Sequence, residues 1–257
     1  KTDSYESKVK VPSPRLWTPE TPYLYRLNVR IKDTEGNTVD GYACRIGIRS
    51  IAFDDKDGFV LNGKPYGKPL SGVNRHQDFA VIGNAVPNSL HWRDAKKIRE
   101  AGFNIVRLSH YPQDPAFMDA CDELGLFVIV PTPGWQFWNT WPEFGKHVES
   151  DIRNMVRRDR NHPCVLFWEP ILNETGLWGE SVAYDKKVQG NAARIVREEY
   201  PYPGCYPAGG PEDSFTVLYG GEPKPGKTYF IREYGDGGNV NNWHGQNAPN
   251  RAARDWG

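Results

Sequence analysis

From about residue 69 onward, the sequence repeats one unit, in which a short apolar run is followed by a polar loop and then by an amphipathic segment. The apolar runs have few polar breaks, as is typical of strands buried on both faces, and the amphipathic segments have helical periodicity. The predicted strand units are PLSGVNR, FNIVRLSH, LFVIVP, CVLFWEP, GCYPAGG, FTVLYGG and TYFIREYG. Strands that alternate with helices in this way predict an α/β fold with a parallel sheet.

Two architectures show this alternation, the doubly wound sheet and the (β/α)8 barrel. The first strand–helix turn contains no glycine-rich phosphate loop, which argues against a doubly wound dinucleotide-binding fold. Most predicted strands instead end in polar or aromatic residues, and barrel enzymes place catalytic residues at that end of several strands. The sequence therefore predicts a (β/α)8 TIM barrel. Its seventh helix is expected at NRAARDWG, at the end of the chain, so we expect the barrel to be truncated before strand 8.

Residues 1–57 follow a different pattern. The segments YLYRLNVRIKD and TVDGYACRIGIRSIAF alternate between apolar and polar residues, and the sequence TEGN between them predicts a turn and hence a β-hairpin. A segment of this length cannot close a β-sandwich by itself. We therefore expect residues 1–57 to be the C-terminal part of an all-β sandwich domain, and residues 58–257 to be a barrel domain that is incomplete at its C-terminus.

The composition excludes some classes of partner. Lysine plus arginine and aspartate plus glutamate number 32 each, so the formal net charge is zero and gives no support for nucleic acid or an acidic membrane surface as the partner. The four cysteines form no CxxC pair, and no apolar run approaches the length of a membrane span. No signal peptide is found, and the compartment stays open between cytoplasm and periplasm. The nine tryptophans and thirteen tyrosines are consistent with a carbohydrate ligand.

Two glutamates follow well-separated predicted strands. Glu174 comes after CVLFWEP, and Glu233 ends the last strand unit. A pair of carboxylates at strand ends is what glycoside hydrolysis requires, one as nucleophile and one as acid/base. Alternatively, Glu174 is a surface acid in the first turn of a helix, where acids are favoured. The alternative for Glu233 is an ion pair with Arg232.

Several longer motifs make the sequence resemble glycoside hydrolase family 2, which contains β-galactosidases, β-glucuronidases and β-mannosidases. The motifs are LNGKP with GVNRHQD, FNIVRLSHYPQDPAFMDACDELGLFVI, MVRRDRNHPCVLFWEPILNE and REYGD. Upstream, LWTPETPYLYRLNV resembles the immunoglobulin-like domain that precedes the barrel in this family. The resemblance spans roughly residues 13–240 and implies a catalytic barrel behind an immunoglobulin-like sandwich.

The resemblance also implies roles for individual residues. Glu174 corresponds to the acid/base and Glu233 to the nucleophile. Asn173 corresponds to the asparagine that hydrogen-bonds the sugar 2-hydroxyl, and Tyr219 to the tyrosine that hydrogen-bonds the nucleophile.

His76 and His110 correspond to two histidines that steady the sugar and the transition state. Arg75 and Arg107 are expected beneath them, with Arg107 orienting the nucleophile carboxylate by charge-assisted hydrogen bonds. A structural role in capping a strand end is the alternative for each histidine.

The sequence departs from the family pattern at two places. Glu174 follows Trp168 by one residue more than is usual, which leaves Glu169 as a rival acid. After the third strand the sequence reads PTPGWQFWN, without the carboxylate and histidine of the magnesium-binding members, so we expect no catalytic metal and no cofactor. Trp135 and Trp138 in this segment are candidates for one wall of the sugar site, with packing under a loop as the alternative.

The resemblance thus implies a retaining glycoside hydrolase that cleaves terminal β-D-galactosides, with an oligosaccharide or a β-galactoside as substrate. The motif that binds a uronate carboxylate is not found, which disfavours a β-glucuronidase. A β-mannosidase or β-glucuronidase of the same family, an inactive folded fragment, and a non-catalytic carbohydrate-binding module are the alternatives. Whether the protein forms a homo-oligomer is left open.

Overall fold

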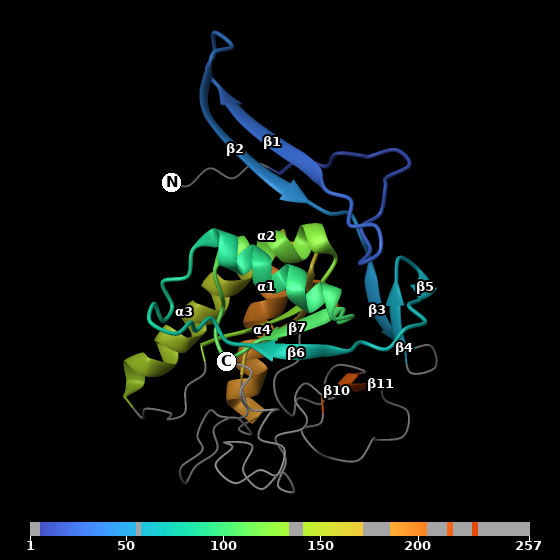
Figure 1. The fold of residues 1–257 in the computed structure, drawn as a ribbon. Helices are drawn as coiled ribbons and strands as arrows, with labels where there is room; N and C mark the ends of the chain where they lie inside the picture. Colours follow the sequence, from blue (N-terminus) through green and yellow to red (C-terminus); the bar gives the residue numbers. More distant parts are fainter. Residues whose placement is uncertain are drawn as a thin grey trace, which may run out of the picture.

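The computed structural model describes residues 6–54, 58–133, 141–171, 186–204, 215–217 and 228–230 of the chain. A β-rich N-terminal part precedes a part in which parallel strands and helices alternate (Figure 1). This is the order of elements that the sequence predicts.

Strands β1 (Tyr25–Lys32) and β2 (Thr38–Ile46) form the predicted antiparallel hairpin. Its turn is fixed by Asp33, whose Oδ1 accepts hydrogen bonds from the backbone N–H groups of Glu35 (2.9 Å) and Asn37 (2.8 Å). Because paired residues point to the same face, Leu27, Val29 and Ile31 share an exposed apolar face with Cys44 and Tyr42. The basic residues of the opposite face include Arg45, which forms an ion pair with Asp119 at 2.9 Å.

A second, three-stranded antiparallel sheet contains β3 (Ile51–Asp54), β4 (Gly58–Leu61) and β5 (Lys64–Pro65). The turn between β4 and β5 is at Asn62-Gly63, where both residues have positive φ (54° and 75°), as a two-residue hairpin turn of type I′ requires. Phe53 stacks on Phe59 and on Phe167, so this small sheet joins the core of the α/β part.

The four-stranded parallel sheet has the order β6-β7-β8-β9. Its strands are β6 (Gly72–Arg75), β7 (Ile105–Leu108), β8 (Phe127–Pro131) and β9 (Val165–Glu169). Strands β7, β8 and β9 each pair with the strand before them in the sequence, whereas a doubly wound sheet reverses its strand order at a switch point. The described sheet therefore has the connectivity of successive barrel strands. Two further short strands, β10 (Phe215–Val217) and β11 (Thr228–Phe230), pair in parallel with each other.

The helices are α1 (Asn88–Glu100), α2 (Pro115–Leu124), α3 (Pro142–Asp159) and α4 (Lys186–Glu199). Helix α2 shows why the sequence begins and ends a helix where it does. Asp114 caps its first turn by accepting a hydrogen bond from Ala116 N at 2.8 Å, Pro115 occupies the first helical position, and Gly125 ends the helix in the left-handed conformation (φ 72°). None of the helices in the described ranges has the length and apolar character of a membrane-spanning segment.

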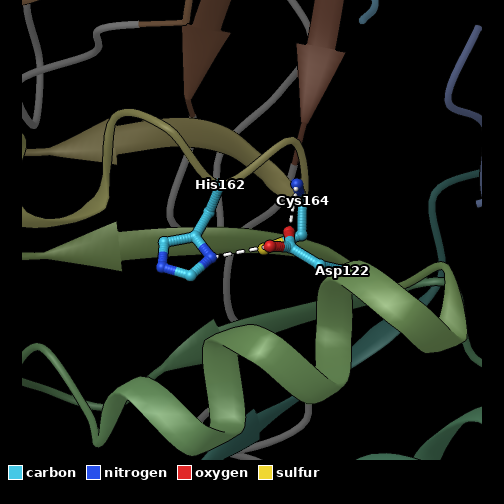
Figure 2. A group of neighbouring side chains, drawn as sticks. All are labelled: Asp122, His162 and Cys164. Carbon is cyan, nitrogen blue, oxygen red and sulfur yellow. Dashed lines mark hydrogen bonds and ion pairs between the residues drawn. The ribbon is translucent and has the colours of Figure 1, made fainter. Parts of the chain in front are cut away.

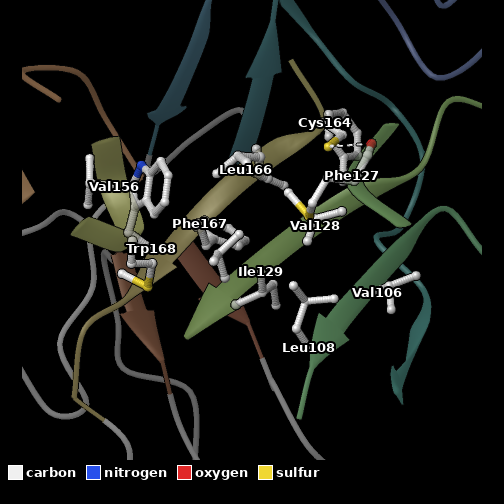
Figure 3. Packing of buried hydrophobic residues seen from close by; sticks show 14 of the residues in the cluster. Val106, Leu108, Phe127, Val128, Ile129, Val156, Cys164, Leu166, Phe167 and Trp168 are labelled. Atoms are coloured by element: carbon white, nitrogen blue, oxygen red, sulfur yellow. Dashed lines mark hydrogen bonds between the residues drawn. The ribbon is translucent and has the colours of Figure 1, made fainter. Parts of the chain in front are cut away.

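The hydrophobic core is built around the buried side chains of β7, β8 and β9, among them Val106, Leu108, Ile129 and Phe167, together with helix residues such as Val156 (Figure 3). Every residue of β7, β8 and β9 is buried, as sequences that are apolar except for Arg107 and Glu169 predict. Trp17 extends this core to the N-terminal part of the chain. Its ring is fully buried and packs edge-on against Phe127 at 5.5 Å, and its Nε1 donates to the carbonyl of Asp122 at 2.9 Å.

Candidate active site at the carboxyl ends of the parallel strands

A buried ion pair joins two strands of the parallel sheet near their carboxyl ends. Nε of Arg107, on β7, donates to Oε2 of Glu169 at 2.8 Å, and Nη2 donates to Oε1 at 3.0 Å. Glu169 is the last residue of β9 and is fully buried, while Arg107 is 2% exposed. Because β8 lies between β7 and β9, the pair spans alternate strands, and alternate strands supply the side chains of one layer inside a barrel. Arg75, which is offset from Arg107 by one residue in the register, contacts Asp94 of α1 and Phe117 of α2, so the pair lies on the face of the sheet away from these helices, which is the interior of a barrel.

The register explains how the two side chains meet. Arg107 lies level with Ile129 on β8, whereas Glu169 lies level with Pro131, two residues nearer the carboxyl end. The long arginine side chain bridges this offset. A bidentate guanidinium–carboxylate pair fixes both groups in one plane and is stronger than a neutral hydrogen bond.

His76 and His110 lie side by side just beyond β6 and β7. The backbone N–H of Ser109 donates to the carbonyl of Arg75 at 2.8 Å, which extends the pairing of the two strands to their last residues. The two imidazole rings are therefore neighbours, with centroids 5.5 Å apart and planes at 85°. His76 is about half exposed, at 53% of its side-chain surface. The structure thus places both predicted histidines together at the carboxyl edge of the sheet.

Arg75 points to the opposite side of the sheet from Arg107. Its neighbour across β6 and β7 is Leu108, while Arg107 is level with Asn74, so the two arginines are offset by one residue and face opposite sides. Arg75 is buried, donates to Asp94 at 2.8 Å and lies over the ring of Phe117. Arg75 was expected beneath the histidines, in support of the site. It lies instead between the sheet and helices α1 and α2.

The Arg75 cluster also contains His91 and Gln113. Nη2 of Arg75 lies 3.2 Å from Nδ1 of His91, and Nη1 donates to the side chain of Gln113. Burial lowers the pKa of His91, and the charge of Arg75 lowers it further. A neutral imidazole that accepts from the guanidinium fits this environment.

The remaining predicted site residues lie outside the described part of the chain. They are Trp135, Trp138, Asn173, Glu174, Tyr219 and Glu233. What sequence reasoning missed is the partnership of Arg107 and Glu169. The signal for it was available, because an acid that ends an otherwise apolar buried strand needs a paired charge.

At the amino end of β9 lies the one group, among the residues described, whose side chains could hold a metal ion (Figure 2). Asp122, His162 and Cys164 bring their donor atoms within 4.8 Å of one another. Asp122 already accepts from Nδ1 of His162 at 2.7 Å and from the backbone N–H of Cys164 at 3.0 Å. Burial raises the pKa of the Cys164 thiol well above its ordinary value, which disfavours the thiolate that a metal requires. The carboxylate of Asp122 thus has its hydrogen-bond donors within the group, and these bonds link α2 to the start of β9.

His162 in this link is a candidate pH-sensitive group. Burial alone lowers the pKa of His162, but the hydrogen bond and the charge of Asp122 outweigh burial, so the pKa is raised. The link sits at the end of β9 opposite Glu169, and we assign it no part in the candidate active site.

Comparison with protein families gives two matches. The family described as "Glycosyl hydrolases family 2, TIM barrel domain" matches residues 51–191, and the family described as "Glycosyl hydrolases family 2" matches residues 1–49. The first match covers more than half of the chain. The sequence-based expectation of a barrel domain behind a sandwich domain is confirmed by these two matches.

Curated relatives and solved structures agree with the family matches. A β-galactosidase of Thermoanaerobacter pseudethanolicus is 40% identical over 171 residues, which are 65% of this chain and 22% of that protein. A putative β-glucuronidase of Formosa agariphila is 38% identical over 62% of this chain and 19% of its own length. The crystal structure of an FMN-binding β-glucuronidase from Facaelibacterium prausnitzii superposes with a TM-score of 0.71 at 28% identity, covering 81% of this chain and 33% of that one. The chain thus spans about a fifth of the length of these curated relatives.

Proposed function

The chain belongs to glycosyl hydrolase family 2, and on this premise we propose that the protein is a retaining glycosidase that cleaves terminal β-D-galactosides. The observation that carries the proposal is the arrangement at the carboxyl edge of the parallel sheet. His76 and His110 lie together there, and Arg107 is held by Glu169 on the interior face. Barrel enzymes assemble their catalytic sites at this edge, from residues that follow several strands.

The proposed mechanism is a double displacement. The carboxylate of Glu233 attacks the anomeric carbon while Glu174 gives its proton to the leaving glycosidic oxygen, so that a glycosyl-enzyme ester forms and the aglycone leaves. Glu174, now ionised, takes a proton from water, and that water attacks the anomeric carbon and releases Glu233. Two inversions give net retention of configuration. No redox step and no further reactant is required.

The other proposed roles support these two acids. Asn173 binds the sugar 2-hydroxyl, and Tyr219 donates a hydrogen bond to Glu233. His76 and His110 contact sugar hydroxyls at the exposed edge, and Trp135 with Trp138 forms an apolar wall against which a sugar face can pack.

Galactoside specificity is the finer part of the proposal. Two β-galactosidases, from Thermoanaerobacter pseudethanolicus and Thermoanaerobacterium thermosulfurigenes, are each 40% identical to the matched part of this chain. A β-glucuronidase activity is the second candidate, because the crystal structure that superposes at TM-score 0.71 and that of a Bacteroides uniformis β-glucuronidase at 0.69 carry that name. The sequence lacks an evident uronate-binding motif, so we rank the galactoside first.

A panel of 4-nitrophenyl glycosides tests the proposal. The protein, expressed from its complete natural gene, is expected to hydrolyse the β-D-galactoside faster than the β-D-glucuronide, the β-D-mannoside and the α-D-galactoside. Proton NMR of the first-formed sugar should show the β-anomer. A preference for the glucuronide would select the second candidate, and absence of turnover on every glycoside would refute the proposed glycosidase activity.

A further inference from the structure

We infer that Glu169 is a positioning residue, which fixes the guanidinium of Arg107 beneath the sugar site, and that it is not the acid of the reaction. The inference deepens the proposed function and rests on it. It also decides between the two acids that follow Trp168 in the sequence.

The backbone around Glu169 is fixed on two sides. The carbonyl of Glu169 accepts from the N–H of Thr132 at 3.1 Å, and the carbonyl of Pro170 accepts from Oγ1 of Thr132 at 2.8 Å. On the other side of the strand, the N–H of Trp168 donates to the carbonyl of Gly204 at 2.8 Å. Because Pro170 also restricts the residue before it, the end of β9 has little freedom to turn the Glu169 side chain outward.

The side chain is equally constrained. Both carboxylate oxygens accept from Arg107, and the residue has no exposed surface. A general acid must reach the leaving-group oxygen and give up a proton there. To do so, Glu169 would have to break both hydrogen bonds to Arg107 and separate two opposite charges that are buried together, which is costly.

These two hydrogen bonds hold the guanidinium of Arg107 in a single orientation. Glu169 occupies the edge of the guanidinium formed by Nε and Nη2, so Nη1 lies on the edge away from Glu169. A planar guanidinium that is held along one edge directs its Nη1 N–H groups in one fixed direction. In the proposed mechanism these groups orient the nucleophile Glu233, so Glu169 acts on the reaction through Arg107.

The experiment compares Glu169→Gln and Glu169→Asp with Glu174→Gln in protein expressed from the complete gene. Asp122→Asn is the matched control, since Asp122 is an equally buried carboxylate with a hydrogen-bonded basic partner at the other end of β9. Rates are measured with 2,4-dinitrophenyl galactoside, which needs no acid, and with methyl galactoside, which does. Active sites are counted with a covalent inactivator, so that only folded protein contributes to kcat.

For Glu169→Gln we expect kcat to fall by about 10- to 100-fold, and by a similar factor on the two substrates. The reason is that a misplaced Arg107 guanidinium affects the chemical step itself. KM and both limbs of the pH profile should stay near the wild-type values, azide should not restore activity, and Glu169→Asp should recover part of the loss. Asp122→Asn should keep the wild-type kcat per active site even where it lowers stability.

Two outcomes would overturn the inference alone. A loss confined to methyl galactoside, with azide rescue on the dinitrophenyl substrate, would make Glu169 the acid. An unchanged kcat per active site in both Glu169 variants would make the ion pair purely structural. Wild-type protein that turns over no glycoside would instead refute the proposed function, and this inference with it.

Discussion

Glu169 and Arg107 form a bidentate ion pair that is buried from solvent and crosses from β9 to β7 over the strand between them. Taking two charges out of water costs several kcal/mol for each ion, so such a pair is weak evidence for net stability. Removing one member is a different matter, because the other stays buried and loses two charge-assisted hydrogen bonds. The pair therefore makes the interior of the sheet sensitive to single substitutions.

The first prediction concerns the cost of removing one member of this ion pair compared with removing both. Arg107→Met should lower the free energy of unfolding by about 3–5 kcal/mol, since it removes both charge-assisted hydrogen bonds that Arg107 donates to the buried Glu169 carboxylate. The double variant Arg107→Met/Glu169→Leu should regain part of that loss. Urea unfolding measures both. As control, Lys146→Met breaks a pair with Glu143 in which the side chains are 71% and 46% exposed, and should cost about 1 kcal/mol or less. Additive effects in the double variant would show that the two side chains do not interact as described.

The second prediction concerns pH. The pKa of His162 is raised in the folded protein, on balance by Asp122 against the opposing effect of burial. The stabilisation is therefore fully present below the unfolded pKa of about 6.5 and is lost as pH rises through the folded pKa. The difference in unfolding free energy between wild type and His162→Gln should shrink from pH 5 to pH 9. A difference that grows with pH would mean that His162 is held neutral instead.

The third prediction concerns metal dependence. The sequence after β8, PTPGWQFWN, offers tryptophan, glutamine and asparagine instead of the carboxylates that commonly bind hard divalent cations. Glycosidase activity should therefore be insensitive to EDTA and to added magnesium in a stopped assay. A loss of about tenfold on chelation that magnesium reverses would refute this prediction, because it would require oxygen ligands elsewhere in the protein.

Much of the fold follows from local sequence signals. The apolar runs at β7, β8 and β9, the turn at Asn62-Gly63 and the ends of α2 at Asp114 and Gly125 are each specified by a few adjacent residues. The connectivity of the barrel also follows, because each helix returns the chain to the next parallel strand. The division into residues 1–57 and 58–257 stays a prediction.

The candidate site was less predictable. The resemblance to the family implied His76 and His110, and the structure brings their rings together. The partnership of Arg107 with Glu169 joins residues 62 positions apart, on strands that are not neighbours, so no local pattern contains it. The opposite directions of Arg75 and Arg107 depend on a one-residue difference in register, which two short strands of similar sequence do not reveal.

We propose that Glu233 is the nucleophile of a retaining β-galactosidase, with Glu174 as its acid/base. Covalent trapping tests it most directly. A 2-deoxy-2-fluoro-galactoside with an activated leaving group slows hydrolysis of the glycosyl-enzyme, so that the ester accumulates and peptide mass spectrometry can locate it. The label should be found on Glu233, in the peptide that contains REYGD, and Glu233→Gln should abolish it. A label on Glu169, on Glu174 or on any other residue, or stoichiometric labelling of Glu233→Gln, would contradict the account.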